Sequence, residues 1–201
     1  MIKETIDRQT DEALYKHFLL GNKDAFNELI IRYRKLLTNF IMYYIKNSDI
    51  AEDIAQDSFL YMIINKKEYD FKYSFKTYLY TIAKSRTLNY LKKEKKKVYL
   101  NDIDFDNTVA EIDVEDEVIS NFDKEKIKYA MKQLKKEYQI IISLYYFQNF
   151  KYKEISEILN ISLSKTKMCI NRAKKHIREI LKEEEDNDKS RIYWWCVGKI
   201  W

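Results

Sequence analysis

The 201-residue chain contains no proline, two glycines and two cysteines, and its formal net charge at pH 7 is +5. So few helix-breaking residues favour an almost wholly helical fold, and two cysteines cannot supply a disulfide framework, which makes a reducing cytoplasm the simplest location. We expect neither a signal peptide nor a membrane-spanning segment, because charged residues interrupt every long apolar run.

The charge is divided into blocks along the chain. Residues 1–97 contain 19 Lys and Arg against 13 Asp and Glu, residues 98–123 contain 9 acids and no base, and residues 124–182 contain 15 bases against 5 acids. Two basic blocks separated by an acidic strip are typical of a protein that contacts a polyanion at two places. We therefore expect an all-α protein with two small helical domains, 1–97 and 124–182, joined by an acidic linker.

Two helices are predicted first along the chain. Apolar residues recur every three or four positions from Asp24 to Tyr44, which indicates a long amphipathic helix with Asn22 or Asp24 as its N-cap. The break at Asn47-Ser48-Asp49 offers the cap of a second helix, whose apolar stripe we expect to extend as far as Ile63. A group of polar side chains gathers on the opposite side of this second helix: Glu52, Asp53, Gln56 and Asp57.

A polar and aromatic connector, residues 65–74, precedes the third predicted helix. This helix runs roughly from Phe75 to Lys95, and we expect its buried stripe to extend to Leu88 and Leu91. It ends in a basic run at residues 92–97. The following segment, 98–123, shows neither a helical period nor a strand alternation, and we interpret it as an extended or weakly helical linker.

The end of the second basic block fits a helix-turn-helix. Tyr152–Leu159 predicts its first helix, Asn160-Ile161-Ser162 its turn, and the span from about Leu163 to Leu181 its basic second helix, with Ser162 as the N-cap. In such motifs the second helix enters the major groove of DNA, where Lys and Arg neutralise phosphates and Asn171 offers paired hydrogen bonds to a base edge. The alternative interpretation of these side chains is the solvated basic face of a structural helical hairpin. The outward side of this helix presents Ser164, Lys165, Lys167, Met168, Asn171, Arg172, Lys174, Lys175 and Arg178.

Two parts of the chain resemble bacterial sigma factors of the extracytoplasmic-function (ECF) group. The resemblance to region four of that group lies in Ala130–Gln139, Leu144-Tyr145-Tyr146-Phe147, Tyr152–Leu159 and Asn171-Arg172-Ala173-Lys174-Lys175. The resemblance to region two lies in Gly21–Phe26, Arg32-Tyr33, Ala51–Phe59 and Thr77–Ala83. The match covers about residues 20–97 and 124–182, in the order and spacing of the family.

The resemblance implies a non-catalytic subunit that binds core RNA polymerase and carries it to promoters, with no cofactor and no metal. It implies that the acidic side of the second helix docks on the clamp of the polymerase: Glu52, Asp53, Gln56 and Asp57. A capping cluster or a plainly solvated face is the alternative interpretation of these four residues. An anti-sigma factor is a further candidate partner.

The resemblance also implies that the connector matching 70–75 captures a base flipped out of the minus-10 element. Aromatic rings beside cations supply stacking and neutralisation of the backbone for single-stranded DNA. The aromatic residues of the connector are equally suited to a place in the core. The expected minus-10 contacts are Lys72, Tyr73, Ser74, Phe75, Lys76, Lys84, Arg86, Lys92 and Lys93.

The expected minus-35 contacts lie on the second helix of the helix-turn-helix: Ser164, Lys165, Lys167, Met168, Asn171, Arg172 and Lys175. Here the chain departs from the family pattern, which favours an apolar residue at Thr166 and an arginine at Cys169. We therefore expect base choice to depend on neighbours such as Lys165, Met168 and Asn171.

The linker and the tail have open roles. In the family the linker threads through the active-site cleft and RNA exit path of the polymerase, and an acidic linker suits that use, although a merely soluble spacer has the same composition. Residues 183–201 form a tail that is first acidic and then rich in tryptophan. We expect this tail to pack on a domain or to bind a partner.

Three other classes of function are alternatives to a sigma factor. A stand-alone helix-turn-helix repressor accounts for the second basic block but not for the pattern at 51–59, and it tends to bind a palindrome as a dimer. A purely protein-binding helical adaptor predicts no salt-dependent DNA contact. An enzyme is the weakest alternative, since we find no metal-ligand spacing, phosphate-binding loop or catalytic triad.

Overall fold

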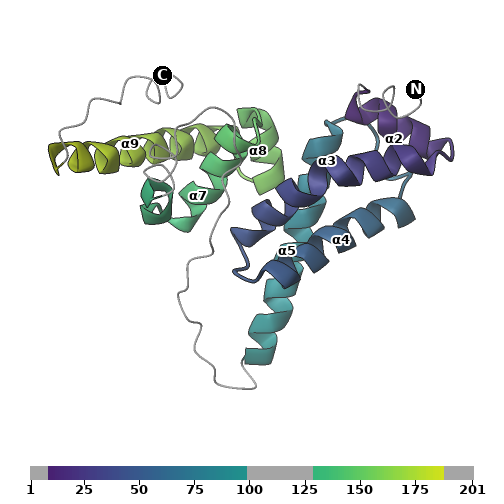
Figure 1. Cartoon of the computed structure of the whole chain (residues 1–201), viewed down its shortest axis with the longest axis horizontal. Coiled ribbons are helices and arrows are strands. Elements are labelled where there is room, and N and C mark those ends of the chain that lie inside the picture. The colour runs from purple at the N-terminus through teal and green to yellow at the C-terminus, as the bar shows by residue number, and fades with distance from the viewer. Residues whose placement is uncertain (1–8, 99–128, 188–201) are drawn as a thin grey trace. The chain divides into compact units, whose positions relative to one another are not determined.

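The computed structural model describes residues 9–98 and 129–187, and no strand occurs in these two stretches (Figure 1). The predicted all-α class is confirmed for this part of the chain. Contacts between Cα atoms divide the chain into two compact units, and within the described residues the first comprises 9–98 with 153–161 and the second 129–152 with 162–187. The acidic linker after Val98 and the tryptophan-rich part of the tail lie outside the described residues.

Residues 153–161 of the first unit include most of helix α8 (Tyr152–Leu159). Residues 9–98 of the same unit contain four helices (Figure 1). They are α2 (Asp11–Leu19), α3 (Lys23–Met42), α4 (Ser48–Ile64) and α5 (Phe75–Val98). The long helix α3 packs against α2 and α4, and α5 contacts all three of the others. Burial of one apolar stripe from each helix forms a single core, as the periodicity of the sequence requires.

The N-caps of this unit follow from short polar side chains. Asn22 accepts hydrogen bonds from the backbone of α3, and Asn47 accepts one from Ile50 N at the start of α4, so both predicted caps are confirmed. Such a cap contributes about 1 kcal/mol because it satisfies a backbone N–H group that has no partner within the helix. Gly21 joins α2 to α3 with a φ of 101°, a conformation that costs little only in glycine.

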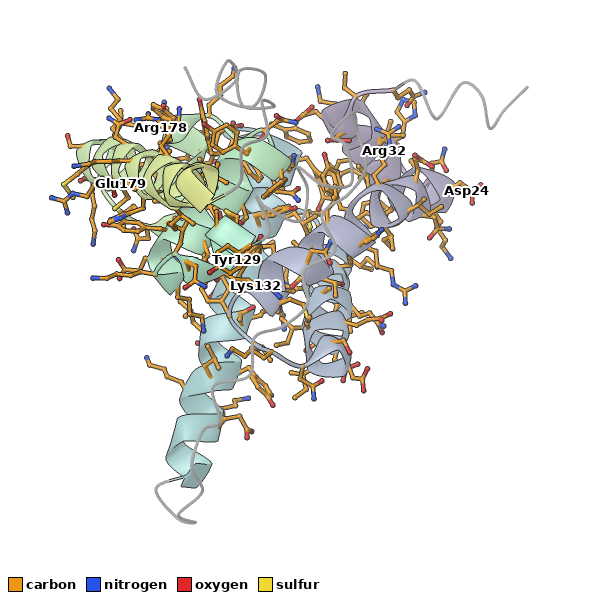
Figure 2. All side chains as sticks on the ribbon, turned by 60° about the vertical axis from the view of Figure 1, so that its left-hand side comes forward. Asp24, Arg32, Tyr129, Lys132, Arg178 and Glu179 are labelled. Atoms are coloured by element: carbon orange, nitrogen blue, oxygen red, sulfur yellow. The ribbon has the colours of Figure 1, made fainter. Side chains whose placement is uncertain are left out.

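Helix α2 was not predicted from the sequence. Thr10 caps it by accepting a hydrogen bond from Ala13 N. Figure 2 shows Arg32 of α3, whose guanidinium donates to Asp11 at 3.0 Å and to the backbone oxygen of Gln9 at 2.9 Å. Tyr33 also donates to Asp11. These contacts fasten α2 to α3, and they join residues more than 20 positions apart in the chain.

Two predicted core positions, Ile63 and Leu88, were wrong, and a third, Leu91, is only half-buried. Ile63 is 41% exposed, because Met62, its immediate neighbour, occupies the buried position of that turn of α4. Leu88 is 43% exposed, because Thr87 takes the buried place on α5 and donates its hydroxyl hydrogen to Ala83 O. Adjacent residues of a helix point about 100° apart, so only one of the two enters a narrow core.

The second unit contains a short helix at 129–133, helix α7 (Lys136–Ile142), a π-helical turn η1 (Ser143–Phe147) and helix α9 (Leu163–Asn187). Helix α7 packs on α9 and runs directly into η1. The predicted end of α9 at Leu181 was too early.

The turn between α8 (Tyr152–Leu159) and α9 has the predicted position. Asn160 adopts a φ of 51°, which asparagine tolerates better than most residues, and Ile161 N donates to Ser156 O. Ser162 Oγ then accepts a hydrogen bond from Lys165 N at 3.2 Å, which confirms it as the N-cap of α9.

Candidate functional site

The acidic side of α4 is turned to solvent. Asp53, Gln56 and Asp57 are exposed, and Glu52 is half-buried. Glu52 forms an ion pair with Arg34 of α3 and lies 3.4 Å from Gln56 Nε2. Because Asp53, Gln56 and Asp57 are exposed side by side on this helix, the face offers a negative potential to a basic partner.

Arg86 joins this face to the basic residues of α5. Its guanidinium lies 3.7 Å from an Asp57 carboxylate oxygen and 4.9 Å from the centre of the Tyr61 ring. Its side chain therefore packs against α4, whereas from the sequence we expect it to contact minus-10 DNA. A weak surface ion pair of this length, worth less than about 1 kcal/mol, leaves Arg86 free to turn towards another anion.

The aromatic residues of 65–75 divide between core and surface. Tyr69 is 4% exposed and Phe75 is fully buried, so both rings belong to the core. Phe71 and Tyr73 are half-buried. Tyr69 stacks on Tyr78 at 5.1 Å between ring centres, and Phe71 lies 4.4 Å from Tyr69. Tyr69 and Phe75 are thus core residues, and the Phe75 side chain has no exposed surface, whereas Phe71 and Tyr73 keep part of their ring surface accessible.

The connector has a fixed backbone shape. Phe71 adopts a φ of 59°, in the left-handed region that bulky residues rarely enter. The turn is closed by Asp70, whose carboxylate accepts a hydrogen bond from Lys72 N at 3.0 Å. Lys72 Nζ lies 5.6 Å from the centre of the Tyr73 ring, and Ser74 Oγ caps α5 by accepting from Thr77 N. A cation and a ring therefore stand side by side at the surface of this loop.

The remaining basic residues of α5 fall into two groups. Lys92 and Lys93 are exposed. Lys76 and Lys84 are half-buried, and burial lowers the pKa of each ammonium group below its usual value. Lys92 and Lys93 are therefore better placed to neutralise phosphates. The ammonium groups of Lys76 and Lys84 are already partly desolvated in the folded protein.

The basic face of α9 is exposed as predicted. All seven expected minus-35 residues are exposed: Ser164, Lys165, Lys167, Met168, Asn171, Arg172 and Lys175. Two further residues counted on this side, Lys174 and Arg178, are half-buried instead. Lys174 Nζ lies 4.9 Å from the centre of the Tyr145 ring, so it packs on η1.

The two departures from the family pattern in α9 lie on its inner side. Thr166 is fully buried, and its hydroxyl donates to Ser162 O at 3.1 Å. Cys169 is 5% exposed and carries a free thiol. Neither side chain reaches the outward face, so their identities act on packing rather than on direct contact with a ligand.

The described residues contain no group of three or more His, Cys, Asp or Glu side chains that is arranged to hold a metal ion. In the same stretches, no helix has both the length and the hydrophobicity that crossing a bilayer requires.

Sequence reasoning missed the part that α2 plays at the connector. Glu12, Tyr15 and Lys16 all contact residues 66–75 or the helix end beside them. No local pattern signals these contacts, because they join positions more than 50 residues apart.

Comparisons with known proteins give two family matches. The family model described as Sigma-70 region 2 matches residues 29–97, and the model described as Sigma-70, region 4 matches residues 124–177. The first match falls in the first basic block and includes the acidic side of α4. The second falls in the second basic block and includes the basic face of α9.

Curated relatives match most of the chain. The ECF RNA polymerase sigma factor SigW of Bacillus subtilis is 29% identical over 172 residues, which cover 81% of this chain and 92% of SigW. SigM of the same organism is 27% identical over 156 residues, covering 78% and 94%. The ECF RNA polymerase sigma-E factor of Haemophilus influenzae is 25% identical over 180 residues, covering 85% and 95%.

Two solved structures share the fold. The sigma factor RpoE of Bartonella quintana, in complex with the anti-sigma factor NepR, aligns with a TM-score of 0.62 at 20% identity and covers 78% of this chain and 96% of its own. CnrH, in complex with the cytosolic domain of CnrY, aligns with a TM-score of 0.59 at 16% identity, covering 87% and 99%.

Proposed function

Since this chain belongs to the RNA polymerase sigma factors of the ECF group, we propose that it docks on core polymerase through α4 and on promoter DNA through the connector, α5 and α9. The observation that carries this proposal is the presence on one chain, in the family's order, of both sigma regions with their charged faces exposed. In this role the protein recognises the promoter, and the core polymerase catalyses RNA synthesis.

The docking face for core polymerase is the acidic side of α4: Glu52, Asp53, Gln56 and Asp57. Exposure of Asp53, Gln56 and Asp57 supports this assignment, since charge complementarity across an interface raises the association rate and fixes the register. Glu52 is held by Arg34 and accepts a hydrogen bond from Gln56, so it helps to orient the Gln56 amide on this face.

Contact with the minus-10 element is assigned to the connector and α5. Tyr73 and Phe71 offer half-exposed ring surface for an unstacked base, and Lys72 stands beside them. Phe75 is buried and contacts Tyr69, which in turn contacts Phe71, so it acts on the loop through the core. The polar groups that complete the set are Ser74, Lys76, Lys84, Arg86, Lys92 and Lys93.

Contact with the minus-35 element is assigned to the exposed face of α9. Lys165 and Lys167 neutralise phosphates, and Asn171 has the donor and acceptor pair that recognises adenine. Ser164, Met168, Arg172 and Lys175 complete the face. Because core polymerase is the proposed partner, the proposed location is the cytoplasm, and an anti-sigma factor is a second class of partner to be sought by copurification.

The decisive test is transcription in vitro. The purified full-length chain is mixed with sigma-free bacterial core polymerase and a library of genomic fragments, and the 5′ ends of the transcripts are mapped. We expect initiation at discrete start sites that share two separated upstream elements. A chain that neither associates with core nor directs initiation would contradict the proposal, whereas a symmetric site bound by the chain alone would identify a repressor.

Substitution of Asp53 tests the docking face. We expect Asp53→Arg to abolish association with core polymerase, because it places a positive charge at the centre of an acidic face. The matched control is Asp24→Arg, which reverses an exposed charge at the start of α3 (Figure 2). Both variants should keep the helical circular dichroism of the wild type, and normal core binding by Asp53→Arg would remove α4 from the interface.

A further inference from the structure

Both ends of the connector are tied to helix α2. At the first end, the Tyr15 hydroxyl donates to Lys66 O at 3.0 Å and lies 3.4 Å from Met62 O, in the last turn of α4. At the second end, a Glu12 carboxylate oxygen accepts a hydrogen bond from Phe75 N, the first residue of α5, at 3.0 Å. Glu12 and Tyr15 are three positions apart, so both project from one face of α2.

The ties reach backbone groups at or beside a helix end: Met62 O in the last turn of α4, Lys66 O just after that helix, and Phe75 N at the start of α5. The last carbonyl groups of α4 have no donor within their own helix, and the first N–H groups of α5 have no acceptor within theirs. A carboxylate at the N-terminus of α5 also interacts favourably with the helix dipole. One short helix therefore caps the helix that enters the connector and the helix that leaves it.

The middle of the connector needs such support. Phe71 is held in the left-handed region, a conformation that costs about 1–3 kcal/mol and persists only when its surroundings fix it. Lys16 of α2 lies over the Phe71 ring, with its Nζ 5.3 Å from the ring centre. Tyr15 lies 5.2 Å from Tyr69 between ring centres, and burial raises its pKa to about 12, so its hydroxyl stays protonated and able to donate.

Helix α2 is itself anchored away from the connector. Asp11 receives hydrogen bonds from Arg32 and Tyr33, two residues of α3. The path from α3 through α2 to the connector is thus continuous: Asp11 holds α2 on the bundle, and Glu12 and Tyr15 hold the connector on α2.

We propose that Glu12 and Tyr15 are positioning residues that hold the connector in the shape that receives single-stranded minus-10 DNA. This inference rests on the proposed function of the connector. A loop that spends only part of its time in the competent shape binds with an affinity reduced by that fraction. Loss of either tie therefore lowers affinity for the single strand without altering the α4 face or the α9 face.

The test uses polymerase reconstituted with full-length variants. The DNA probe is a single-stranded oligonucleotide that carries the non-template strand upstream of the start site mapped by transcription. We expect Tyr15→Phe and Glu12→Ala each to weaken binding of this probe by about three- to tenfold, the range for one hydrogen bond. Glu12→Gln should bind nearly as the wild type, since its amide oxygen still accepts from Phe75 N. Tyr138→Phe, in the second unit, is the matched tyrosine control.

Two further measurements separate positioning from general stability. Affinity for core polymerase should stay within about twofold of wild type in all variants. The substitutions leave the acidic side chains of α4 in place, so the binding free energy at that face should change by less than the contribution of one hydrogen bond. Amide hydrogen exchange of the free full-length chain should quicken at residues 65–74 in Tyr15→Phe and Glu12→Ala, more than in the rest of α4 and α5.

The outcomes are distinct. Unchanged probe binding in both variants would overturn the inference, and so would an equal loss of probe and core binding. If Tyr15→Phe fails to fold, the contrast between Glu12→Ala and Glu12→Gln carries the same test. If wild-type holoenzyme does not bind the single strand at all, the assigned function of the connector fails, while the exchange data still report whether α2 holds it.

Discussion

Single residues in unusual backbone conformations mark the turns of this protein. Asn160 occupies the left-handed region at the turn between α8 and α9, Asn149 does so just after η1, and Phe71 does so in the connector. Asparagine pays less for this conformation than other residues with a Cβ, because its side chain can bond to the nearby backbone. The two asparagines therefore allow tight turns at low conformational cost. Phe71 adopts the same conformation at a higher cost, which the contacts around it must offset.

Asn160 gives a prediction on stability. Asn160→Ala should lower the free energy of unfolding by about 1 kcal/mol, since alanine enters the left-handed region at a cost of roughly 1–2 kcal/mol. Asn160→Gly, the control, should leave the free energy within a few tenths of a kcal/mol of wild type or raise it slightly. Urea denaturation followed by circular dichroism measures both. Equal stability of the alanine variant would show that the turn relaxes.

Tyr15 gives a prediction on pH. Burial raises its pKa to about 12, above the value of about 10 for an unfolded chain, with a smaller contribution from Tyr78. The folded state therefore holds the phenolic proton more tightly. The resulting stabilisation is complete below pH ~10 and is lost as the pH rises towards 12.

The experiment compares the slopes of stability against pH. Between pH ~10 and 12, the free energy of unfolding should fall less steeply in Tyr15→Phe than in wild type, because the variant lacks one of the titrating hydroxyls. Other buried tyrosines keep part of the slope in both proteins, so the difference isolates Tyr15. Identical slopes would contradict a raised pKa for this group.

At the scale of elements, local sequence predicted most helices and their starts. The caps Asn22, Asn47 and Ser162 and the bounds of α8 follow from short-range signals, and the structure confirms them. Helix α2 was missed because it has only nine residues and its stability comes from Arg32 and Tyr33, which lie beyond any local window.

The candidate site divides in the same way. Exposure of the acidic side of α4 and of the basic face of α9 could be predicted, because helical spacing alone separates the two sides of each helix. The division of the connector's aromatic residues into core and surface could not, since the irregular backbone at Phe71 has no period to follow. The supporting role of Glu12 could not be predicted either, because its hydrogen bond to Phe75 N joins residues far apart in the sequence.

Helix α9 gives a prediction that separates charge from base reading. Lys167→Ala should weaken minus-35 binding by the holoenzyme and lower the slope of log affinity against log salt by about one unit. Asn171→Ala should leave that slope unchanged but relax sequence preference at one position, with a loss of about 1–3 kcal/mol on the preferred base. Lys132→Ala, an exposed change outside α9, is the control. A slope unaltered by Lys167→Ala would exclude a phosphate contact there.

On the scale of the whole molecule, function is shared between two compact units. Each has its own core and its own exposed face, so damage to one face need not spread to the other. We expect mutations in separate units to act additively on promoter binding, as independent sites do.

Footprinting of the holoenzyme tests this independence. The double variant Lys167→Ala/Asn171→Ala should lose protection of the upstream element while it keeps binding to a template that is already melted at the start site. Tyr15→Phe should do the reverse and keep the upstream protection. If each variant erased both protected regions to the same extent, the two units would have to be treated as one cooperative site.

The thiol of Cys169 has a practical consequence. It is 5% exposed on the inner side of α9, so a maleimide or disulfide reagent reaches it only when that packing opens. In a Cys196→Ser background, the rate at which Cys169 is alkylated reports the rate of local opening of the second unit. Comparison of the alkylation rates with and without polymerase would measure how much assembly slows the local opening of α9.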